Sequence, residues 1–156
     1  MGNCVVKVRL LGCLLRPKNS KIKHPMTKDD DDSDQEVEFA SANVEVITTK
    51  ESWDQKLEQA RRDGKVVVAN FSATWCGPCK TIAPCYCELS EKYPSIMFLV
   101  VDVDELTDFS TSWNIKATPT FFFLRDGQEI DKLIGANKPE LEKKIASVSY
   151  SVLHSQ

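Results

Sequence analysis

Apolar positions along the chain predict five β-strands. Residues 44–48 alternate between apolar and polar side chains, which is typical of an edge strand with one buried face. The apolar runs 66–71 and 96–101 predict strands that are buried on both faces. Residues 120–124 and 129–134 flank an Arg-Asp-Gly sequence, which favours a tight turn, so together they predict a hairpin.

Helices are predicted between these strands and after the last one. They cover Ser52 to about Asp63-Gly64, the segment that follows residue 76 and runs toward Tyr93, residues 106–113, and Pro139 to about Val148. Pro84 lies inside the second helix and predicts a kink there. The order of strands and helices predicts an α/β fold in which a central mixed β-sheet carries helices on both faces.

The charged residues divide the chain into an extension and a domain. Residues 1–28 contain seven Lys or Arg and no acidic residue, whereas residues 29–38 contain seven Asp or Glu and no basic residue. Such blocks are typical of tails rather than of a packed core. We therefore expect a disordered N-terminal extension at 1–38, one domain at 39–150 and a C-terminal tail at 151–156.

Composition and cysteine spacing bear on the compartment. No apolar run approaches the ~20 residues of a transmembrane helix. The apolar stretch 8–15 is short, contains Arg9 and lacks a small-residue cleavage site, which argues against a signal peptide. The six cysteines are unequally spaced, unlike a secreted disulfide framework. We expect a cytoplasmic protein, with organelle import through the acid-free first 28 residues as the alternative.

The strongest chemical signal is the stretch Trp-Cys-Gly-Pro-Cys-Lys at residues 75–80. It follows a predicted strand and opens a predicted helix, so Cys76 lies where free backbone N–H groups and the positive helix end stabilise a thiolate. Cys79, one turn further in, is more shielded. We expect Cys76 to be the nucleophile and Cys79 to resolve the mixed disulfide. Pro78 suits a first helical turn.

The motif and its surroundings resemble the thioredoxin family over about 110 residues. The residues that carry the resemblance are Phe71-Ser72-Ala73-Thr74, the stretch 75–80, Val101-Asp102-Val103-Asp104, Ala117-Thr118-Pro119-Thr120 and Leu133-Ile134-Gly135-Ala136. Together they look like a plant h-type thioredoxin, in particular the subgroup whose chains begin Met-Gly-X-Cys, as thioredoxin h9 does. A lone Cys-X-X-Cys would be a weak signal, but this ordered set is specific.

The resemblance implies a thioredoxin fold and a protein-disulfide reductase that acts on disulfide-containing target proteins. Electrons would come from thioredoxin reductase or from glutathione and glutaredoxin, since the chain lacks a Gly-X-Gly-X-X-Gly pattern for a nucleotide. We expect a monomer without a cofactor or a nucleic-acid partner. The alternatives are a secretory-pathway oxidase or isomerase, which would carry His in place of Pro78, and a binding module without turnover.

Residues around the cysteines are candidates for a platform that receives the target. Trp75 can shape the receiving surface, with mere packing as the alternative. By resemblance, Pro119 is a cis-proline that faces the disulfide, and Thr118 offers its backbone to an extended target segment. Gly135 would permit close approach, although a simple strand-end turn explains it equally well. Gly77 and Pro78 complete this predicted platform.

The sequence departs from the family at a buried position. Thioredoxins usually carry an Asp six residues before the nucleophile, as acceptor for the proton of the resolving thiol, and often a Lys near it on the next strand. Here those positions hold Asn70 and Val100. Asn70 cannot take a proton at neutral pH, so the proton of Cys79 must pass to water or to another group.

Two further cysteines follow the motif in the same predicted helix. A zinc site would require Cys85 and Cys87 to join Cys76 and Cys79, but their positions along the helix project in different directions and Pro84 intervenes. We therefore expect no metal. Cys85 is predicted to be a core thiol and Cys87 to be partly exposed.

The amino terminus permits two incompatible uses of Cys4. Removal of Met1 would expose Gly2 for myristoylation, Cys4 could then be palmitoylated, and the basic residues would support peripheral membrane association. Val6 departs from the Ser or Thr that the myristoylation pattern prefers. In the alternatives, the tail is unmodified, or Cys4 remains a thiol that attacks the active-site disulfide, a role for which Cys13 could compete.

Overall fold

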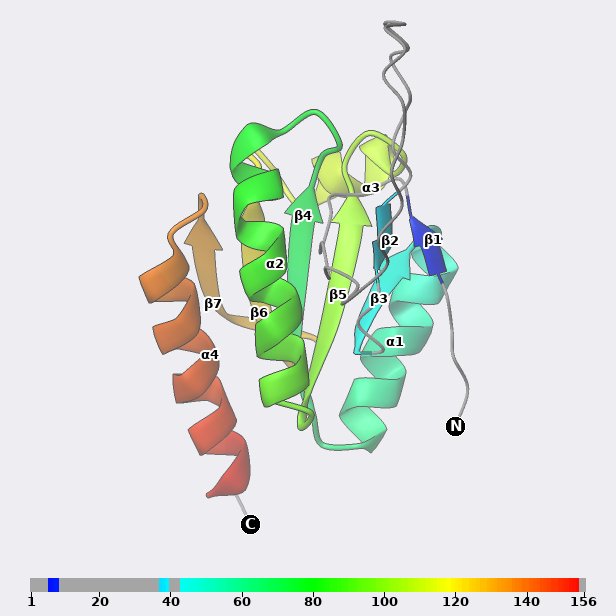
Figure 1. Cartoon of the computed structure of the whole chain (residues 1–156). Helices are drawn as coiled ribbons and strands as arrows, with labels where there is room; N and C mark the ends of the chain where they lie inside the picture. The colour runs from blue at the N-terminus through cyan, green and yellow to red at the C-terminus, as the bar shows by residue number, and fades with distance from the viewer. Residues whose placement is uncertain (1–5, 9–36, 40–42, 155–156) are drawn as a thin grey trace, which may run out of the picture.

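The computed structural model describes residues 6–8, 37–39 and 43–154, and within them a mixed five-stranded sheet forms the centre (Figure 1). Its order is β3-β5-β4-β6-β7. The strands are β3 (Val44–Ile47), β4 (Val66–Ser72), β5 (Ile96–Asp102), β6 (Thr120–Arg125) and β7 (Gln128–Ile134). The first three are parallel, whereas β6 and β7 run antiparallel to their neighbours. This confirms the mixed sheet, with β3 at one edge and β4 at its centre.

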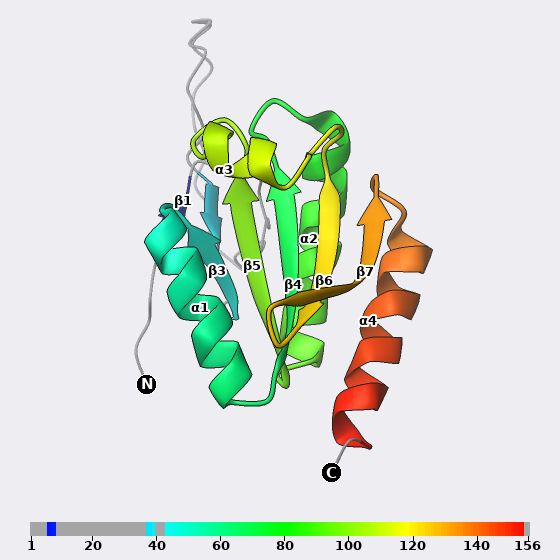
Figure 2. The same cartoon turned by 180° about the vertical axis from the view of Figure 1, so that it is seen from behind.

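Four helices cover both faces of the sheet, as the sequence predicted. They are α1 (Lys50–Arg62), α2 (Gly77–Lys92), α3 (Thr107–Ser112) and α4 (Lys138–Leu153). Helices α2 and α4 lie on the face that is in front in Figure 1, and α1 and α3 lie on the face that is in front in Figure 2. None of the described helices is long and apolar enough to cross a membrane.

The two faces of β4 explain this arrangement. Every residue of β4 is buried, but alternate side chains point to opposite sides. Val66 and Val68 belong to the apolar cluster beneath α2 and α4. Val67 and Phe71 belong to the cluster beneath α1 and α3. A strand that is apolar on both faces can be stable only when helices cover both.

Specific side chains fasten the helices to the sheet. On the α1 side, Trp53 packs edge-on against Phe71 of β4, with ring centroids 6.0 Å apart, and against Phe109 of α3, with centroids 5.2 Å apart. On the α2 side, the hydroxyl of Tyr86 lies 2.9 Å from the carbonyl oxygen of Val68 and 2.8 Å from that of Leu99. Tyr86 therefore ties α2 to the two central strands.

Two helix boundaries differ from the sequence prediction. Helix α1 begins at Lys50 rather than near Ser52, because Thr49 is the N-cap and Ser52 closes a reciprocal capping box with it. Helix α4 continues to Leu153, beyond the predicted domain end at residue 150, so residues 151–153 of the predicted tail are helical.

The described residues before residue 43 form two short strands. Strand β1 (Val6–Val8) pairs antiparallel with β2 (Val37–Phe39), and they form a two-stranded sheet separate from the central one. The sequence pattern did not predict these strands. The rest of the predicted disordered extension, together with the Gly2, Cys4 and Cys13 hypotheses, lies outside the described residues.

Candidate active site

The loop that leaves β4 places Cys76 at the start of α2. Cys76 is the N-cap residue of that helix, with an extended backbone, and its Sγ accepts a hydrogen bond from the backbone N–H of Cys79 at 3.2 Å. Free N–H groups and the positive end of the helix dipole therefore surround this sulfur. The Cys76 residue is 4% exposed and Cys79 is completely buried.

The two cysteines form a disulfide across the first turn of α2. Their Cα atoms lie 5.2 Å apart, which is within the range that a disulfide spans. Gly77 and Pro78 lie between them, and both are exposed. Pro78 occupies the first turn of the helix, where no N–H is required. The pair can therefore be opened to a dithiol with one sulfur nearer the surface than the other.

The loop before β6 lies against the disulfide. The Thr118–Pro119 peptide bond is cis, and the carbonyl oxygen of Thr118 lies 3.4 Å from the Sγ of Cys76. The carbonyl oxygen of Pro119 accepts a hydrogen bond from the N–H of Gly135 at 2.8 Å. Gly135 has a φ of 92°, a conformation that favours glycine. The fold thus brings together residues that are far apart in the sequence.

Trp75 is held at the surface beside the disulfide. Its side chain is 70% exposed, and its indole Nε1–H donates to Oδ2 of Asp104 at 2.7 Å. The N–H of Asp104 in turn donates to Oδ1 of Asp102 at 2.8 Å. Asp102 is buried, and this burial raises the pKa of its carboxyl above the ordinary value, although hydrogen bonds from the Asp104 and Glu105 backbone oppose the shift.

These two aspartates are site residues that sequence reasoning missed. Asp102 and Asp104 entered only as part of the family resemblance, and nothing in their spacing linked them to Trp75, 29 residues before Asp104. A polar residue at the end of a buried strand was the one available signal. The hydrogen bond to Asp104, whose backbone N–H in turn donates to Asp102, orients the exposed indole of Trp75.

Asn70 lies on the face of β4 that points toward α2. It is 4% exposed, it is opposite Val100 in register, and its Oδ1 has no hydrogen-bond partner within the described structure. Two residues further on the same face, the buried hydroxyl of Ser72 is also without a partner there. Two unpaired buried polar atoms under the active-site helix are unusual and mark this spot as polar.

The two remaining cysteines of α2 are both buried. Cys85 is a free cysteine whose pKa is raised by burial. Cys87 is only 6% exposed, so the prediction that it is partly exposed is wrong; it faces the cluster beneath α2 and α4. No group of three or more His, Cys, Asp or Glu side chains that could hold a metal ion occurs among residues 43–154 and the two short strands.

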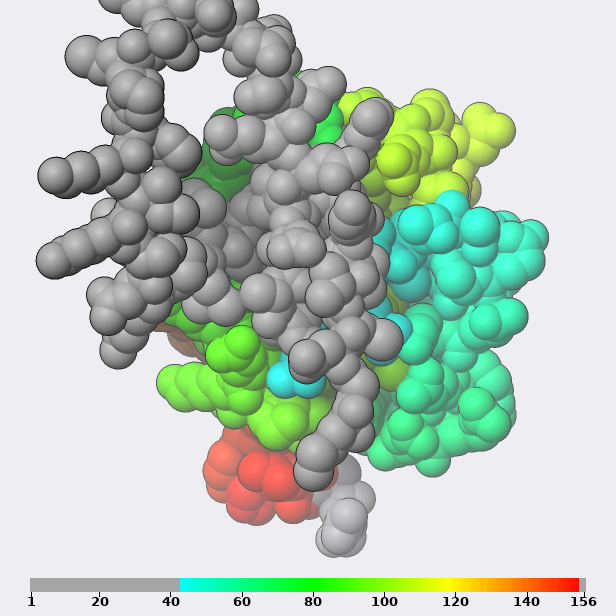
Figure 3. All heavy atoms as spheres, turned by 45° about the vertical axis from the view of Figure 1, so that its right-hand side comes forward, coloured from blue at the N-terminus to red at the C-terminus, as the bar shows by residue number. Residues whose placement is uncertain are grey.

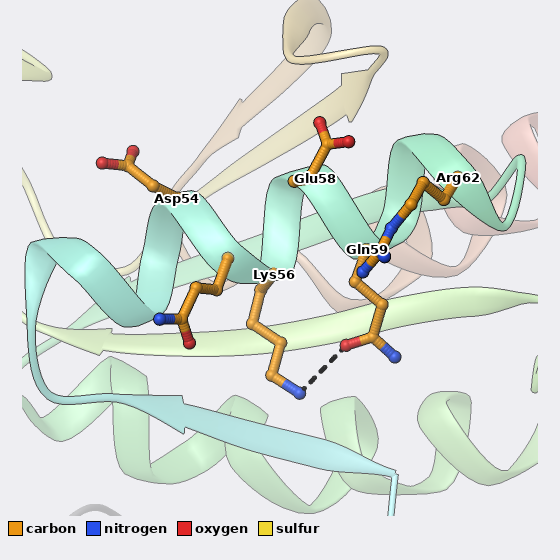
Figure 4. A pocket seen from close by; sticks show the side chains of 6 residues that line it. Asp54, Lys56, Glu58, Gln59 and Arg62 are labelled. Atoms are coloured by element: carbon orange, nitrogen blue, oxygen red, sulfur yellow. Dashed lines mark hydrogen bonds between the residues drawn. The ribbon is translucent and has the colours of Figure 1, made fainter.

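Two pockets lie away from the disulfide, next to α1 and α3. The outer face of α1 carries a shallow pocket of about 590 Å³ lined by polar and charged side chains, including Lys56, whose Nζ donates to Oε1 of Gln59 (Figure 4). Helices α1 and α3 lie on one side of the molecule (Figure 3), and a pocket of about 540 Å³ runs from Lys50 along α3. Neither pocket is lined by a cysteine.

Comparisons with known proteins agree with this geometry. The sequence matches the family described as Thioredoxin over residues 44–147. It is 72% identical over 120 residues to a thioredoxin H-type of Populus jackii, covering 77% of this chain and 86% of the relative. Thioredoxin H9 of Arabidopsis thaliana is 70% identical over 128 residues, covering 82% and 91%. A crystal structure of a poplar wild-type thioredoxin h gives a TM-score of 0.68 at 72% identity, covering 74% and 100%.

A buried Cys-X-X-Cys disulfide at a helix start, on a mixed sheet and in a chain with these relatives, defines a thiol-disulfide oxidoreductase with the thioredoxin fold. The chain belongs to the thioredoxin family and, within it, to the h-type thioredoxins of plants. It reduces disulfides of target proteins by thiol-disulfide exchange and receives electrons from a reductase. The resemblance seen in the sequence is thereby confirmed.

Proposed function

We propose that Cys76 attacks the target and that Cys79 resolves the intermediate. The thiolate of Cys76 attacks one sulfur of the target disulfide, a mixed disulfide forms, and the other target sulfur leaves as a thiolate. Cys79 then loses its proton and attacks the Sγ of Cys76. This step closes the Cys76–Cys79 disulfide and releases the second target thiolate. Each released thiolate takes up a proton.

The positions of the two sulfurs support this division of roles. The N–H of Cys79 donates to the Sγ of Cys76, and a donor at the positive end of a helix favours the thiolate there. Cys79 is fully buried, so a bulky target disulfide cannot reach it first. The position of Cys76 as the N-cap of α2, where its sulfur accepts the N–H of Cys79, is the observation that carries the proposal.

A platform around Cys76 receives the target. We assign to it Trp75, Gly77, Pro78, Thr118, Pro119 and Gly135. Thr118 is partly exposed, and its carbonyl oxygen lies beside Cys76, where an extended segment of the target can pair with its backbone. The exposed indole of Trp75 provides an apolar wall on the other side of the motif.

Turnover with separate electron donors tests the proposed activity. Insulin reduction is measured with NADPH and thioredoxin reductase in one reaction, and with glutathione and glutaredoxin in a parallel one. We expect turnover with at least one donor, and none from a Cys76→Ser variant. A wild-type protein that binds insulin but reduces none of it with either donor would instead be a binding module.

The amino terminus supports a second, separate proposal about location. We propose that the protein is cytoplasmic and that part of it associates peripherally with membranes through lipids on Gly2 and Cys4. Gly2 follows the initiator Met, Cys4 is two residues on, and seven basic residues lie within residues 1–28. One acyl chain binds membranes only marginally, whereas two lipid signals, or one with a basic segment, bind stably.

A fluorescent tag at the carboxy terminus tests this proposal in plant cells. Gly2→Ala should move the protein from membranes to the cytosol, and Cys4→Ser should produce an intermediate distribution because one chain remains. Wild-type protein that is already cytosolic would reject lipidation. In that case Cys4→Ser is assayed for slower reduction by glutathione, with Cys13→Ser as the matched comparison.

A third proposal concerns the domain limits and the oligomeric state. We propose a monomer made of an extension at 1–38, a thioredoxin domain at 39–150, and a tail of which residues 151–153 continue α4. The central sheet and both apolar clusters lie within residues 44–152 and support a single independent core. Light scattering of the full chain should give the mass of one chain, 17.6 kDa.

A further inference from the structure

A small pocket opens next to the loop that contacts Cys76. Its volume is about 250 Å³, and its walls include Lys116 and Ala117 of the loop, Thr120 and Phe122 of β6, and Lys132 and Ile134 of β7. Ala117 and Thr120 stand on either side of the Thr118–Pro119 bond in the sequence. The pocket therefore adjoins the backbone that we assign to target binding, and it is distinct from the disulfide itself.

The charged groups of this pocket are of one sign. Lys116 and Lys132 are exposed, no carboxylate lines the pocket, and neither ammonium group forms an ion pair with another described residue. Asp131, the neighbour of Lys132, does not compensate the charge. Adjacent strand residues point to opposite faces, and Asp131 is bound by Lys144 of α4 at 2.6 Å on the other side of the sheet.

The pocket also has an apolar part. The side chain of Ile134 is 60% exposed, which is unusual for isoleucine, and the ring of buried Phe122 lies with its centroid 5.4 Å from the Nζ of Lys132. An aromatic face beside an ammonium group holds that group in place. Such surroundings suit a side chain with an apolar stem and a negatively charged end, such as glutamate.

The spacing along the sequence between Thr118 and the pocket residues sets where this side chain must lie in a target. The oxygen of Thr118 is 3.4 Å from the Sγ of Cys76, and Thr118 is one residue from Ala117 and two residues from Thr120. An extended chain advances about 3.3 Å per residue. We propose that the pocket binds an acidic side chain of the target about two to four residues from the attacked cysteine, an assignment that rests on the proposed target-binding role of Thr118.

Electrostatics of this kind is modest but measurable. Exposed pairs of opposite charge stabilise a complex weakly, so two lysines should favour an acidic target by about two- to tenfold in kcat/KM. Salt screens exposed charges, so this preference should shrink when the ionic strength approaches about 1 M.

The test uses the full chain and two sets of three disulfide-bonded peptides. In each set the peptides differ at the third residue from the attacked cysteine, which is Glu, Gln or Lys. The changed position lies before the cysteine in one set and after it in the other. We expect the order Glu, Gln, Lys in kcat/KM. The Lys116→Gln/Lys132→Gln variant should lose this order and give similar kcat/KM values for the Glu, Gln and Lys peptides.

A matched variant controls for the lower net charge. Lys92 and Lys143 are exposed and line another pocket between α2 and α4, so Lys92→Gln/Lys143→Gln removes the same charge elsewhere. This control should keep the wild-type preference. Equal kcat/KM for the three peptides, or the same preference in both double variants, would overturn the pocket assignment. Absence of turnover with every peptide would contradict the proposed function itself, and the assignment with it.

Discussion

We propose that Asn70 limits which groups can accept the proton of Cys79. Its amide is buried on the face of β4 beneath α2, with Val100 rather than a cation opposite it. An amide neither takes nor releases a proton at neutral pH. The unpaired hydroxyl of Ser72 on the same face adds a polar atom that can order water but is itself no base. We therefore expect resolution of the mixed disulfide to rely on water or on a more distant group.

Replacement of Asn70 by Asp should restore a buried proton acceptor. The rate at which Cys79 releases a trapped target should then follow a new titration, measured by stopped-flow between pH 5 and pH 9. Because the carboxylate is buried without a cation, the free energy of unfolding should fall by about 1–3 kcal/mol at neutral pH. Asn70→Ser, which adds no acid, is the control. An unchanged pH profile in a folded Asp variant would show that this position does not govern the proton.

Asp102 should make stability depend on pH. Its pKa in the folded protein is raised above the ordinary 3.8 because burial disfavours the carboxylate. A carboxyl of this kind stabilises the fold fully below pH 3.8, and this contribution is lost as pH rises through the folded pKa. Asp102→Asn keeps an oxygen for the N–H of Asp104, so we expect it to gain free energy of unfolding relative to wild type at pH 7 but not at pH 3.

Urea unfolding at the two pH values measures this effect. Asp126→Asn is the matched control, because Asp126 is exposed in the hairpin turn and has a φ of 51°, which Asn tolerates. It removes one carboxylate from an exposed site and so controls for the change in net charge. A relative gain for Asp102→Asn at pH 3 rather than at pH 7 would reverse the sign of our argument.

At the residue scale, sequence and structure contributed different parts of the site. The pairing of Cys76 with Cys79 could be predicted because both cysteines lie in one short segment. The closeness of Thr118 to Cys76 bridges 42 residues and came from the resemblance alone. The hydrogen bonds that connect Trp75, Asp104 and Asp102 could not be predicted, since they depend on how the ends of β4 and β5 meet.

At the element scale, α2 carries the Cys76–Cys79 disulfide, and Tyr86 anchors this helix to the sheet. The Tyr86 side chain is fully buried, and its hydroxyl reaches carbonyl oxygens of β4 and β5. Burial raises the pKa of this phenol well above its ordinary value. The hydroxyl therefore stays neutral and remains a donor.

Tyr86→Phe should destabilise the fold by about 1–2 kcal/mol, because a buried hydrogen bond is lost while the ring packing is kept. Denaturant unfolding measures the change. Tyr150→Phe is the matched control: Tyr150 is 65% exposed, and its substitution should change stability by less than about 0.5 kcal/mol. A Tyr86→Phe variant as stable as wild type would mean that the hydroxyl does not fasten α2 to the sheet.

Strand predictions were more reliable than helix ends. The buried strands β4 and β5 are long apolar runs, and the turn at Asp126-Gly127 carries the positive φ values that its sequence favours. Helix α1 begins two residues before the predicted start at Ser52. Thr49 and Ser52 are both suitable N-cap residues, and only the backbone conformation decides which of them is the N-cap. Helix α4 extends beyond its predicted end near Val148, because residues 149–153 contain no Gly or Pro that would end a helix. The kink expected at Pro84 stays a prediction.

At the scale of the whole molecule, two apolar clusters on opposite faces of one sheet make the domain. Each contains residues of β4 and β5, so the two central strands couple both layers of helices. The β1–β2 pair is a separate sheet of three residues per strand. The charge blocks gave no hint of it, since three-residue strands carry too little pattern to stand out.

Removal of residues 1–38 should leave the domain folded. An isolated two-stranded pair is only marginally stable, so we expect the free energy of unfolding of a 39–156 chain to lie within about 1 kcal/mol of the full chain. Thermal and urea unfolding of both chains measure the difference. A loss of several kcal/mol would show that the extension belongs to the core, and the proposed domain limits would then be wrong.

The division of roles between the two cysteines is the central claim, and trapping of mixed disulfides tests it most directly. Cys76→Ser and Cys79→Ser variants are each incubated with a disulfide-bonded target, and intact masses are measured without reductant. We predict that Cys79→Ser accumulates a covalent adduct of protein and target through Cys76, because the resolving thiol is absent. Cys76→Ser should form none. Equal trapping by both variants, or trapping by Cys76→Ser alone, would contradict the account.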